Sequence, residues 1–184
     1  YEEDEVSRLL DEDLNEPIYN EIQHWSVAEL REYILRLDVT NTELRRMSKG
    51  LTSEMIAAVT KLMSNMDLVY AANKIEIITT CNSAIGQRGT LSSRLQPNHP
   101  TDNIDGIMAS LKEGLAYGVG DAVIGINPVD DSVESVKRVL HATKEFMTEW
   151  QVPTQNCVLA HVTTQMKAIR QGAPADMVFQ SIAG

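Results

Sequence analysis

Cysteine, basic residues and long apolar runs are all scarce in this sequence. Its two cysteines, Cys81 and Cys157, are too few for a disulfide framework. No apolar stretch is long enough to span a bilayer and no signal peptide opens the chain, so a reducing, cytoplasmic location is expected. The 16 basic residues are outnumbered by 26 acidic ones, which argues against a protein that binds nucleic acid through a basic surface.

Hydrophobic residues, in contrast, are plentiful enough for a folded core. They make up 43% of the 184 residues, so extensive disorder is not expected. The chain starts at Tyr1 rather than at a methionine and stops at Gly184, directly after a strand-like run. A parallel strand that ended there would have an unpaired edge, so we expect a segment of a longer polypeptide.

Residues 1–88 are predicted to form an α-helical N-terminal region. A capping-box signature at Ser26–Glu29 precedes apolar residues that share one helical face, namely Leu30, Tyr33, Ile34 and Leu37. A second apolar stripe follows Gly50 and comprises Met55, Ile56, Val59, Leu62 and Met63. Ile75–Ile78 fits either a continuation of these helices or a short strand. The turn-rich segment Gly86–Gly89 is the predicted domain boundary.

Residues 89–184 alternate between short apolar runs and long helical patterns. The predicted strands are Leu91–Gln96, Ala122–Ile126, Cys157–Val162 and Met177–Ile182. The predicted helices are Asp102–Leu115, Ser132–Thr148 and Thr164–Arg170. Strands that alternate with helices form parallel sheets through right-handed crossovers. The pattern therefore predicts an α/β fold with about four βα units, which is the first half of a TIM (β/α)8 barrel.

Polar side chains end these strands, at the edge where parallel strands bring their carboxyl ends together. Arg94 and Gln96 share one face of the first strand because side chains alternate, and Asn127 and Gln180 end the second and fourth. Inside a barrel Arg94 must form a structural ion pair or contact a ligand, since burying an unpaired charge is costly. One cation and several amides would suit a neutral hydroxyl or carbonyl oxygen, whereas an amine would need acids from another part of the protein.

Two other sequence features each have a functional and a structural interpretation. Gly118–Gly120 ends a helix and enters a strand, the reverse of a dinucleotide-binding turn, so we interpret it as a flexible turn. His161 stands at a strand end without a second histidine or an acid at ligand spacing. A general base or a metal ligand is one interpretation, and a hydrogen-bonded structural imidazole is the commoner one.

Five segments, read in order, resemble the large subunit of ethanolamine ammonia-lyase. They are KGLTSE (49–54), SRLQPN (93–98), GVGDAVIGINPV (118–129), PTQNCVLAHVTTQ (153–165) and FQSI (179–182). The resemblance runs through essentially the whole chain and matches an internal part of that subunit. It implies a helical region ahead of an eight-stranded barrel whose second half lies outside this sequence.

The resemblance also implies an activity, a cofactor and partners. The family converts ethanolamine to acetaldehyde and ammonia with adenosylcobalamin by a radical mechanism, and the cobalamin sits between large and small subunits. A hetero-oligomer with the small subunit is therefore expected, without nucleic acid or membrane as a partner. The expected location is the cytoplasm, with a bacterial microcompartment within it as the alternative.

The matching motifs carry the family's site residues onto this chain. Arg94, Gln96 and Asn127 match substrate contacts and are the candidate catalytic residues, and Leu95 lies in the same substrate-binding stretch. Pro128 and Gln180 match cobalamin contacts, and no metal ligand is assigned. The family's substrate-binding acids correspond to positions downstream of Gly184, which agrees with the lack of carboxylates noted above.

Two other functions stay open on the residues alone. One is a barrel lyase or aldolase with a Schiff-base lysine, which is disfavoured because no lysine lies within the four predicted strands. The other is an interaction module in which the helical half binds a partner. If the chain is a segment of the lyase, we expect it to be inactive by itself, because half of the site and the small subunit are missing.

Overall fold

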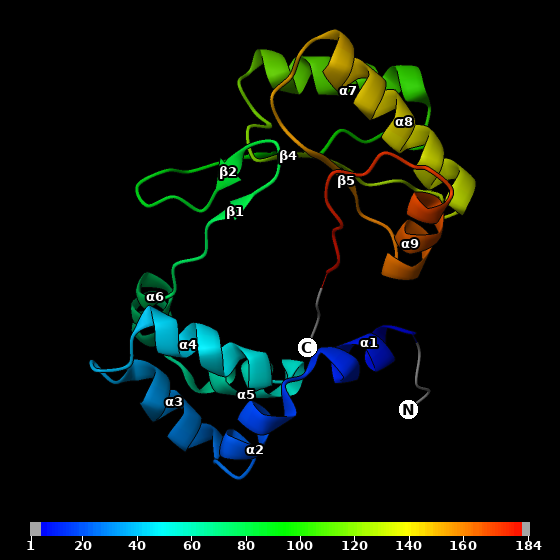
Figure 1. The fold of residues 1–184 in the computed structure, drawn as a ribbon. Helices are drawn as coiled ribbons and strands as arrows, with labels where there is room; N and C mark the ends of the chain where they lie inside the picture. The colour runs from blue at the N-terminus through cyan, green and yellow to red at the C-terminus, as the bar shows by residue number, and fades with distance from the viewer. Residues whose placement is uncertain (1–4, 182–184) are drawn as a thin grey trace. The chain divides into compact units, whose positions relative to one another are not determined.

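The computed structural model describes residues 5–181, which form two compact units (Figure 1). The first unit ends at Ile77 and the second begins at Ile78. The first is helical, and the second combines helices with strands. The structure thus shows a mixed α/β chain, and the placement of a domain boundary at residues 88 and 89 stays a prediction.

Short helices build the first unit. Their bounds are α1 Glu5–Asp13, α2 Glu16–Ile22, α3 Val27–Leu35, α4 Asn41–Met47, the 3-10 helix η1 Ser48–Gly50, α5 Ser53–Leu62 and α6 Asn65–Lys74. A side-chain oxygen caps the start of every α-helix from α2 to α6 by accepting a backbone N–H. The predicted capping box of Ser26 and Glu29 is confirmed.

The core of the helical unit is apolar throughout. It contains Ile22, Leu30, Ile34, Val39, Leu44, Met47, Val59 and Ala71. The predicted helical face is wrong at its last member, because α3 ends at Leu35 and leaves Leu37 exposed. Ile75–Ile78 is neither helix nor strand. Next to the core lies an apolar groove of about 380 Å³, lined by residues that include Leu51, Ile56, Met63, Leu68 and Ile75.

A β-hairpin that the sequence did not predict opens the second unit. Strand β1 (Thr79–Thr80) pairs antiparallel with β2 (Ala84–Ile85), and the backbone N–H of Cys81 donates to the carbonyl of Ser83 in the turn. The prediction of a helical region up to residue 88 is therefore wrong beyond Lys74. These strands lack the long apolar alternation that reveals a strand in sequence.

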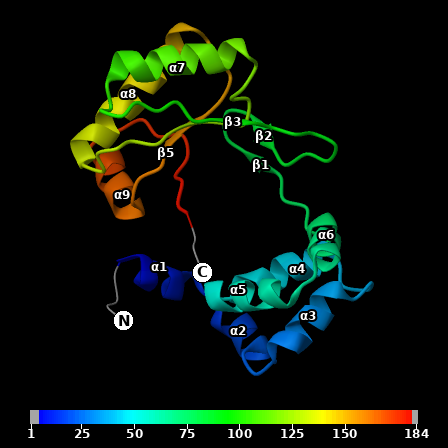
Figure 2. The same cartoon turned by 180° about the vertical axis from the view of Figure 1, so that it is seen from behind.

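A parallel sheet with helices between its strands forms the rest of the unit (Figure 2). The elements are β3 Arg94–Leu95, α7 Ile104–Ala116, β4 Val123–Ile126, α8 Val133–Glu149, β5 Asn156–Val158 and α9 Val162–Arg170. The strands neighbour one another in chain order, β3-β4-β5, as the alternation predicted. A parallel bridge between Leu159 and Phe179 adds the segment where the fourth strand was expected.

The strands are shorter than predicted. The first contains two residues instead of six, and exposed Leu91 lies outside it. The third ends at Val158 because α9 begins at Val162, four residues later, with His161 as its N-cap. The fourth is represented by the bridge at Phe179, and its predicted end at Ile182 lies outside the described residues.

One face of the sheet packs against the helices. Side chains from alternate strand positions, including Leu95, Ile124, Ile126 and Val158, join residues of α7, α8 and α9 in the core. The strand residues between them belong to the opposite face. This division into two faces follows from the period of two in strands, and it positions the candidate site.

Candidate functional site

Arg94 lies on the sheet face that points away from the helices. Its Nη2 donates a 3.3 Å hydrogen bond to the carbonyl of Gly125 on β4. Its guanidinium carbon lies 4.4 Å from the ring centroid of Phe179. The side chain thus begins on β3, crosses β4 and ends over the segment beyond β5.

The guanidinium of Arg94 is poorly neutralised. Its Nε is buried and has no hydrogen-bond partner. No carboxylate within residues 5–181 forms an ion pair with it. The structural ion pair that the sequence left open is therefore not found among these residues, and the cation remains able to bind an oxygen ligand.

Cys157 lies next to Arg94 on the same sheet face. Its Cα pairs with Gly125 in the register of β4 and β5, and the residue is buried. Burial raises the pKa of the Cys157 thiol, and the positive charge of Arg94 opposes that shift in part. The thiol is therefore protonated at neutral pH and adds no negative charge beside Arg94.

The two residues that follow Arg94 differ in exposure. The side chain of Leu95 is buried in the helix-facing core against α7. Only the backbone of Leu95 can therefore face the side on which Arg94 lies. Gln96 is exposed and follows the last residue of β3, so its place on the face of Arg94 stays a prediction.

Asn127 and Pro128 directly follow β4 and are half-buried. The backbone N–H of Asn127 donates to the side-chain oxygen of Asn98 at 3.3 Å, which ties the ends of β3 and β4 together. The next two backbone N–H groups, of Val129 and Asp130, donate to the buried carboxylate of Asp102 at 2.8–3.1 Å. The loop that carries Asn127 and Pro128 is thus fixed from both sides.

The role of Asp102 in holding the loop after β4 was not predicted from the sequence. We predicted it as the first residue of a helix, but α7 begins at Ile104 with Asn103 as its cap. Asp102 adopts a φ of 50° and turns its carboxylate toward the loop after β4. An aspartate just ahead of a helix is normally a cap, so the sequence offered no signal for this contact.

The side chains of Gln180 and His161 both accept backbone N–H groups at the start of α9. The Oε1 atom of Gln180 accepts the backbone N–H of Val162 at 3.1 Å. Nδ1 of His161 accepts the backbone N–H of Thr163 at 3.3 Å, which is the kind of hydrogen bond that the structural interpretation of His161 predicts. No group of three metal-ligating side chains occurs in the described part of the chain.

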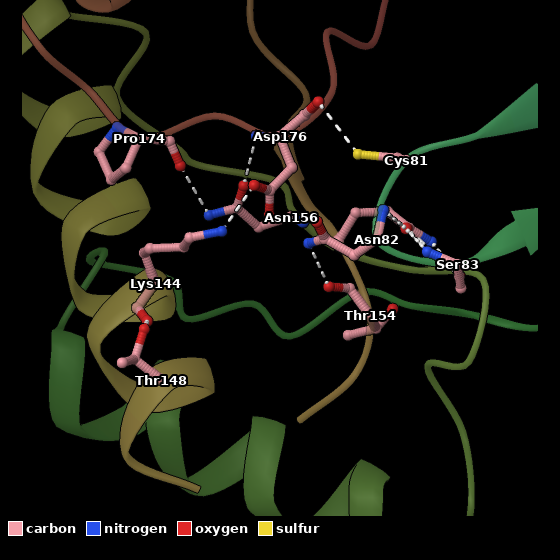
Figure 3. A network of polar contacts seen from close by, with 10 residues as sticks. Cys81, Asn82, Ser83, Lys144, Thr148, Thr154, Asn156, Pro174 and Asp176 are labelled. Carbon is pink, nitrogen blue, oxygen red and sulfur yellow. Dashed lines mark hydrogen bonds and ion pairs between the residues drawn. The ribbon is translucent and has the colours of Figure 1, made fainter. Parts of the chain in front are cut away.

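The opposite, amino-terminal edge of the sheet carries a second polar network (Figure 3). The side chain of Asn156 donates to the carbonyl of Pro174 at 3.0 Å and accepts the N–H of Asp176 at 2.8 Å. Lys144 of α8 forms a 2.6 Å ion pair with Asp176. Because these contacts satisfy one another, we interpret the network as structural.

Gln155 connects this edge to the hairpin. Its side-chain oxygen accepts the backbone N–H groups of Asn82 and Ser83 at 3.2 and 3.1 Å, and its Nε2 donates to the carbonyl of Ala122. Asn82 also donates to the carbonyl of Thr154 at 2.8 Å (Figure 3). The polar groups of the amino edge therefore satisfy one another, whereas Nε of Arg94 has no hydrogen-bond partner among residues 5–181.

Comparison with known proteins agrees with the resemblance noted in the sequence. The family model for "Ethanolamine ammonia lyase large subunit" matches residues 1–184. The chain is 52% identical over 184 residues to the ethanolamine ammonia-lyase large subunit of Escherichia coli strain K12, and 51% identical to that of Salmonella typhimurium. It is covered completely in both comparisons and spans 41% of the length of each relative. The chain belongs to the family of ethanolamine ammonia-lyase large subunits.

Proposed function

We propose that this chain forms part of the catalytic subunit of an adenosylcobalamin-dependent lyase that converts ethanolamine to acetaldehyde and ammonia. Membership of the family supports the reaction class. The observation that carries the proposal is the guanidinium of Arg94, which lies on the sheet face opposite the helices without a carboxylate partner among residues 5–181. Such a group is suited to a ligand oxygen.

The sheet is the first half of a (β/α)8 barrel in this proposal. Its strands are parallel, adjacent in chain order and covered by helices on one face. The face with Arg94 would then become the barrel interior, and the loops after the strands would surround the substrate, as in other barrels of this class.

Arg94 binds the hydroxyl oxygen of ethanolamine in this mechanism. A guanidinium attracts an oxygen lone pair and repels the substrate's ammonium group. The ammonium end would be held by acids that correspond to positions beyond Gly184. This arrangement orients the carbon that carries the hydroxyl group, from which a hydrogen atom must be removed.

Gln96 and Asn127 provide hydrogen bonds to the two ends of the substrate. Gln96 directly follows β3 and is exposed, and the loop with Asn127 is held by Asn98 and Asp102. Leu95 contributes through its backbone, since its side chain is in the core. The loss of one such hydrogen bond would cost about 1–3 kcal/mol.

Pro128 and Gln180 would hold the cobalamin. The corrin ring carries amide side chains, which pair well with a side-chain amide such as Gln180 and with backbone groups around a half-buried proline. Oε1 of exposed Gln180 accepts the N–H of Val162 and its Nε2 donates to the carbonyl of Ser181, so one N–H and one lone pair of this amide are left for a corrin amide. When bound, adenosylcobalamin supplies the radical that removes the substrate hydrogen atom.

The protein partner in this proposal is the small subunit of the lyase, together with the rest of the large subunit. The expected location remains the cytoplasm, with a bacterial microcompartment as the alternative. The segment of 184 residues alone should form no acetaldehyde from ethanolamine, because the acids for the ammonium end are missing. Acetaldehyde formation by this isolated segment would contradict the assignment of those acids.

Replacement of Arg94 in the full-length complex tests the function. Arg94→Ala should lower kcat/KM for ethanolamine by about a hundredfold or more, the effect of removing one preorganised donor to a substrate oxygen. Arg94→Lys should restore part of the loss because it keeps the charge but not the planar fork. Arg170→Ala, which removes an exposed arginine of α9, is the matched control. Unchanged kinetics for Arg94→Ala would refute the role.

A further inference from the structure

The guanidinium of Arg94 is held by groups outside the matched substrate motif. The carbonyl oxygen of Gly125 accepts a hydrogen bond from Nη2 of Arg94. The guanidinium carbon of Arg94 lies 4.4 Å from the centroid of the Phe179 ring. No other hydrogen bond to this side chain is found within residues 5–181. A long side chain has many rotamers, so these two contacts decide where the cation lies.

Gly125 makes room for this position. A Cβ atom placed on Gly125 would lie 2.5 Å from Nε and 2.7 Å from Nη2 of Arg94. Gly125 is not among the residues with positive φ, so its backbone conformation is open to alanine. Glycine is therefore needed at this position to leave space for the side chain of Arg94, and not to form a turn.

The ring of Phe179 is separable from the placement of its backbone. The carbonyl of Phe179 accepts Nε2 of Gln165 at 2.6 Å, and its N–H donates to Oε1 of Gln165 at 3.3 Å. These bonds and the bridge to Leu159 fix the main chain without the ring. A substitution of the side chain can thus remove the face under the guanidinium and keep the strand segment.

We propose that Phe179 and Gly125 are positioning residues, which set the guanidinium of Arg94 for the substrate oxygen. The inference rests on the proposed function of Arg94 and extends the site by two residues that do not contact the substrate themselves. An aromatic face attracts a guanidinium and leaves its edge N–H groups free. The carbonyl of Gly125 fixes one of these groups, and the remaining ones can donate to the substrate.

A double-mutant cycle in the full-length complex with the small subunit tests the proposal. The measured quantity is the Kd of ethanolamine by calorimetry with cyanocobalamin bound, since this analogue lacks the adenosyl group and permits binding without turnover. Phe179→Leu should weaken binding about tenfold, the effect of losing a desolvated cation–π contact. Phe179→Tyr, which keeps the ring, should bind as the wild type does.

The combination with Arg94→Ala separates positioning from general stability. In the Arg94→Ala background, Phe179→Leu should cause almost no further loss, because the ring acts through a side chain that is gone. Gly125→Ala should likewise weaken ethanolamine binding in the otherwise wild-type complex, and it should leave the Kd unchanged in the Arg94→Ala complex. Trp150→Leu removes a ring from beneath Lys112 outside the site and should leave the Kd unchanged.

Three results would overturn the inference, each in a recognisable way. Equal losses from Phe179→Leu in both backgrounds would show a purely structural role. A wild-type Kd in both Phe179→Leu and Gly125→Ala would show that Arg94 needs neither group. A wild-type complex that does not bind ethanolamine would refute the proposed function and this inference with it.

Discussion

Helix caps formed by near neighbours in sequence define the helical unit, whereas buried polar side chains that join distant segments define the α/β unit. Among residues 7–181, the buried polar side chains all lie beyond Ile78 and include Asp102, Gln155, Asn156 and Gln165. The buried residues of the helical unit are apolar or glycine. Local signals can therefore specify the helices, but the sheet and its loops need contacts that form only in the folded chain.

The cores of the two units also differ. Nine apolar residues of the α/β core, among them Ile107, Leu111 and Ile124, have 0% exposure, whereas the helical unit leaves Ile56, Val69 and Ile77 about half exposed. Burial of apolar surface stabilises by about 25 cal/mol per Å². The α/β unit should therefore be the more resistant to local opening.

A pair of isoleucine substitutions should give the largest contrast. Ile124→Ala removes a side chain with 0% exposure and should lower the free energy of local opening by about 3–4 kcal/mol, since it leaves a cavity in the core. Ile56→Ala, at 47% exposure, should cost less than about 1 kcal/mol. Hydrogen–deuterium exchange of peptides from each unit of the full-length protein measures both effects. Equal effects would contradict the difference between the cores.

Replacement of Gln155 should have the next largest effect. Gln155→Leu preserves the approximate volume but leaves the N–H groups of Asn82 and Ser83 and the carbonyl of Ala122 without their partner. Unsatisfied buried groups should lower the protection of the hairpin amides by about 2–3 kcal/mol. Gln23→Leu, at an exposed position of the helical unit, is the control. Unchanged hairpin exchange would mean that Gln155 does not hold the turn.

The smallest effect concerns an ion pair of the helical unit and depends on pH. Arg31 forms a 2.6 Å ion pair with Asp67 and holds the pKa of that carboxyl below its usual value, with help from the N–H of Ser64. Because the folded pKa is depressed, the stabilisation is present above the unfolded value of about 4 and is lost as the pH falls through the folded pKa.

Asp67→Asn should therefore increase exchange of the α3 and α6 amides at neutral pH, and the difference from the wild type should vanish in acid. Exchange measured between neutral pH and about pH 3 follows this change, with Asp13→Asn, at an exposed position of α1, as the control carboxylate in the same unit. A difference that persists below the folded pKa would show that the charge of Asp67 is not the cause.

The same contrast explains what could be predicted from the sequence. Ser26 and Glu29 signal a helix start because their reciprocal bonds span three residues, and α7 and α8 were predicted to within about two residues at each end. The order of the sheet followed from alternation alone. The hairpin, by contrast, depends on Gln155, more than seventy positions away, and no pattern near residue 80 announces that contact.

For the candidate site, the sequence predicted that Arg94 lies on one face of a strand, but it did not predict which residues contact the guanidinium. The alternation rule predicted that Gln96 shares the face of Arg94, but the resemblance that put Leu95 in the substrate-binding stretch did not reveal that its side chain is in the core. The contact of Arg94 with Phe179 joins the first and the fourth predicted strands, which are not adjacent. It also requires a glycine at position 125, because a Cβ atom there would collide with the guanidinium. The hydrogen bonds from the loop after β4 to the carboxylate of Asp102 were likewise not predictable from the sequence.

The most direct test of the central claim is the distance from the guanidinium of Arg94 to the substrate oxygen. It can be measured in a crystal structure of the full-length large and small subunits with a bound cobalamin and ethanolamine. The account predicts an Nη atom within about 2.7–3.2 Å of the hydroxyl oxygen, with the ring of Phe179 still beneath the guanidinium. An Arg94 paired with a carboxylate, and ethanolamine bound elsewhere, would contradict it.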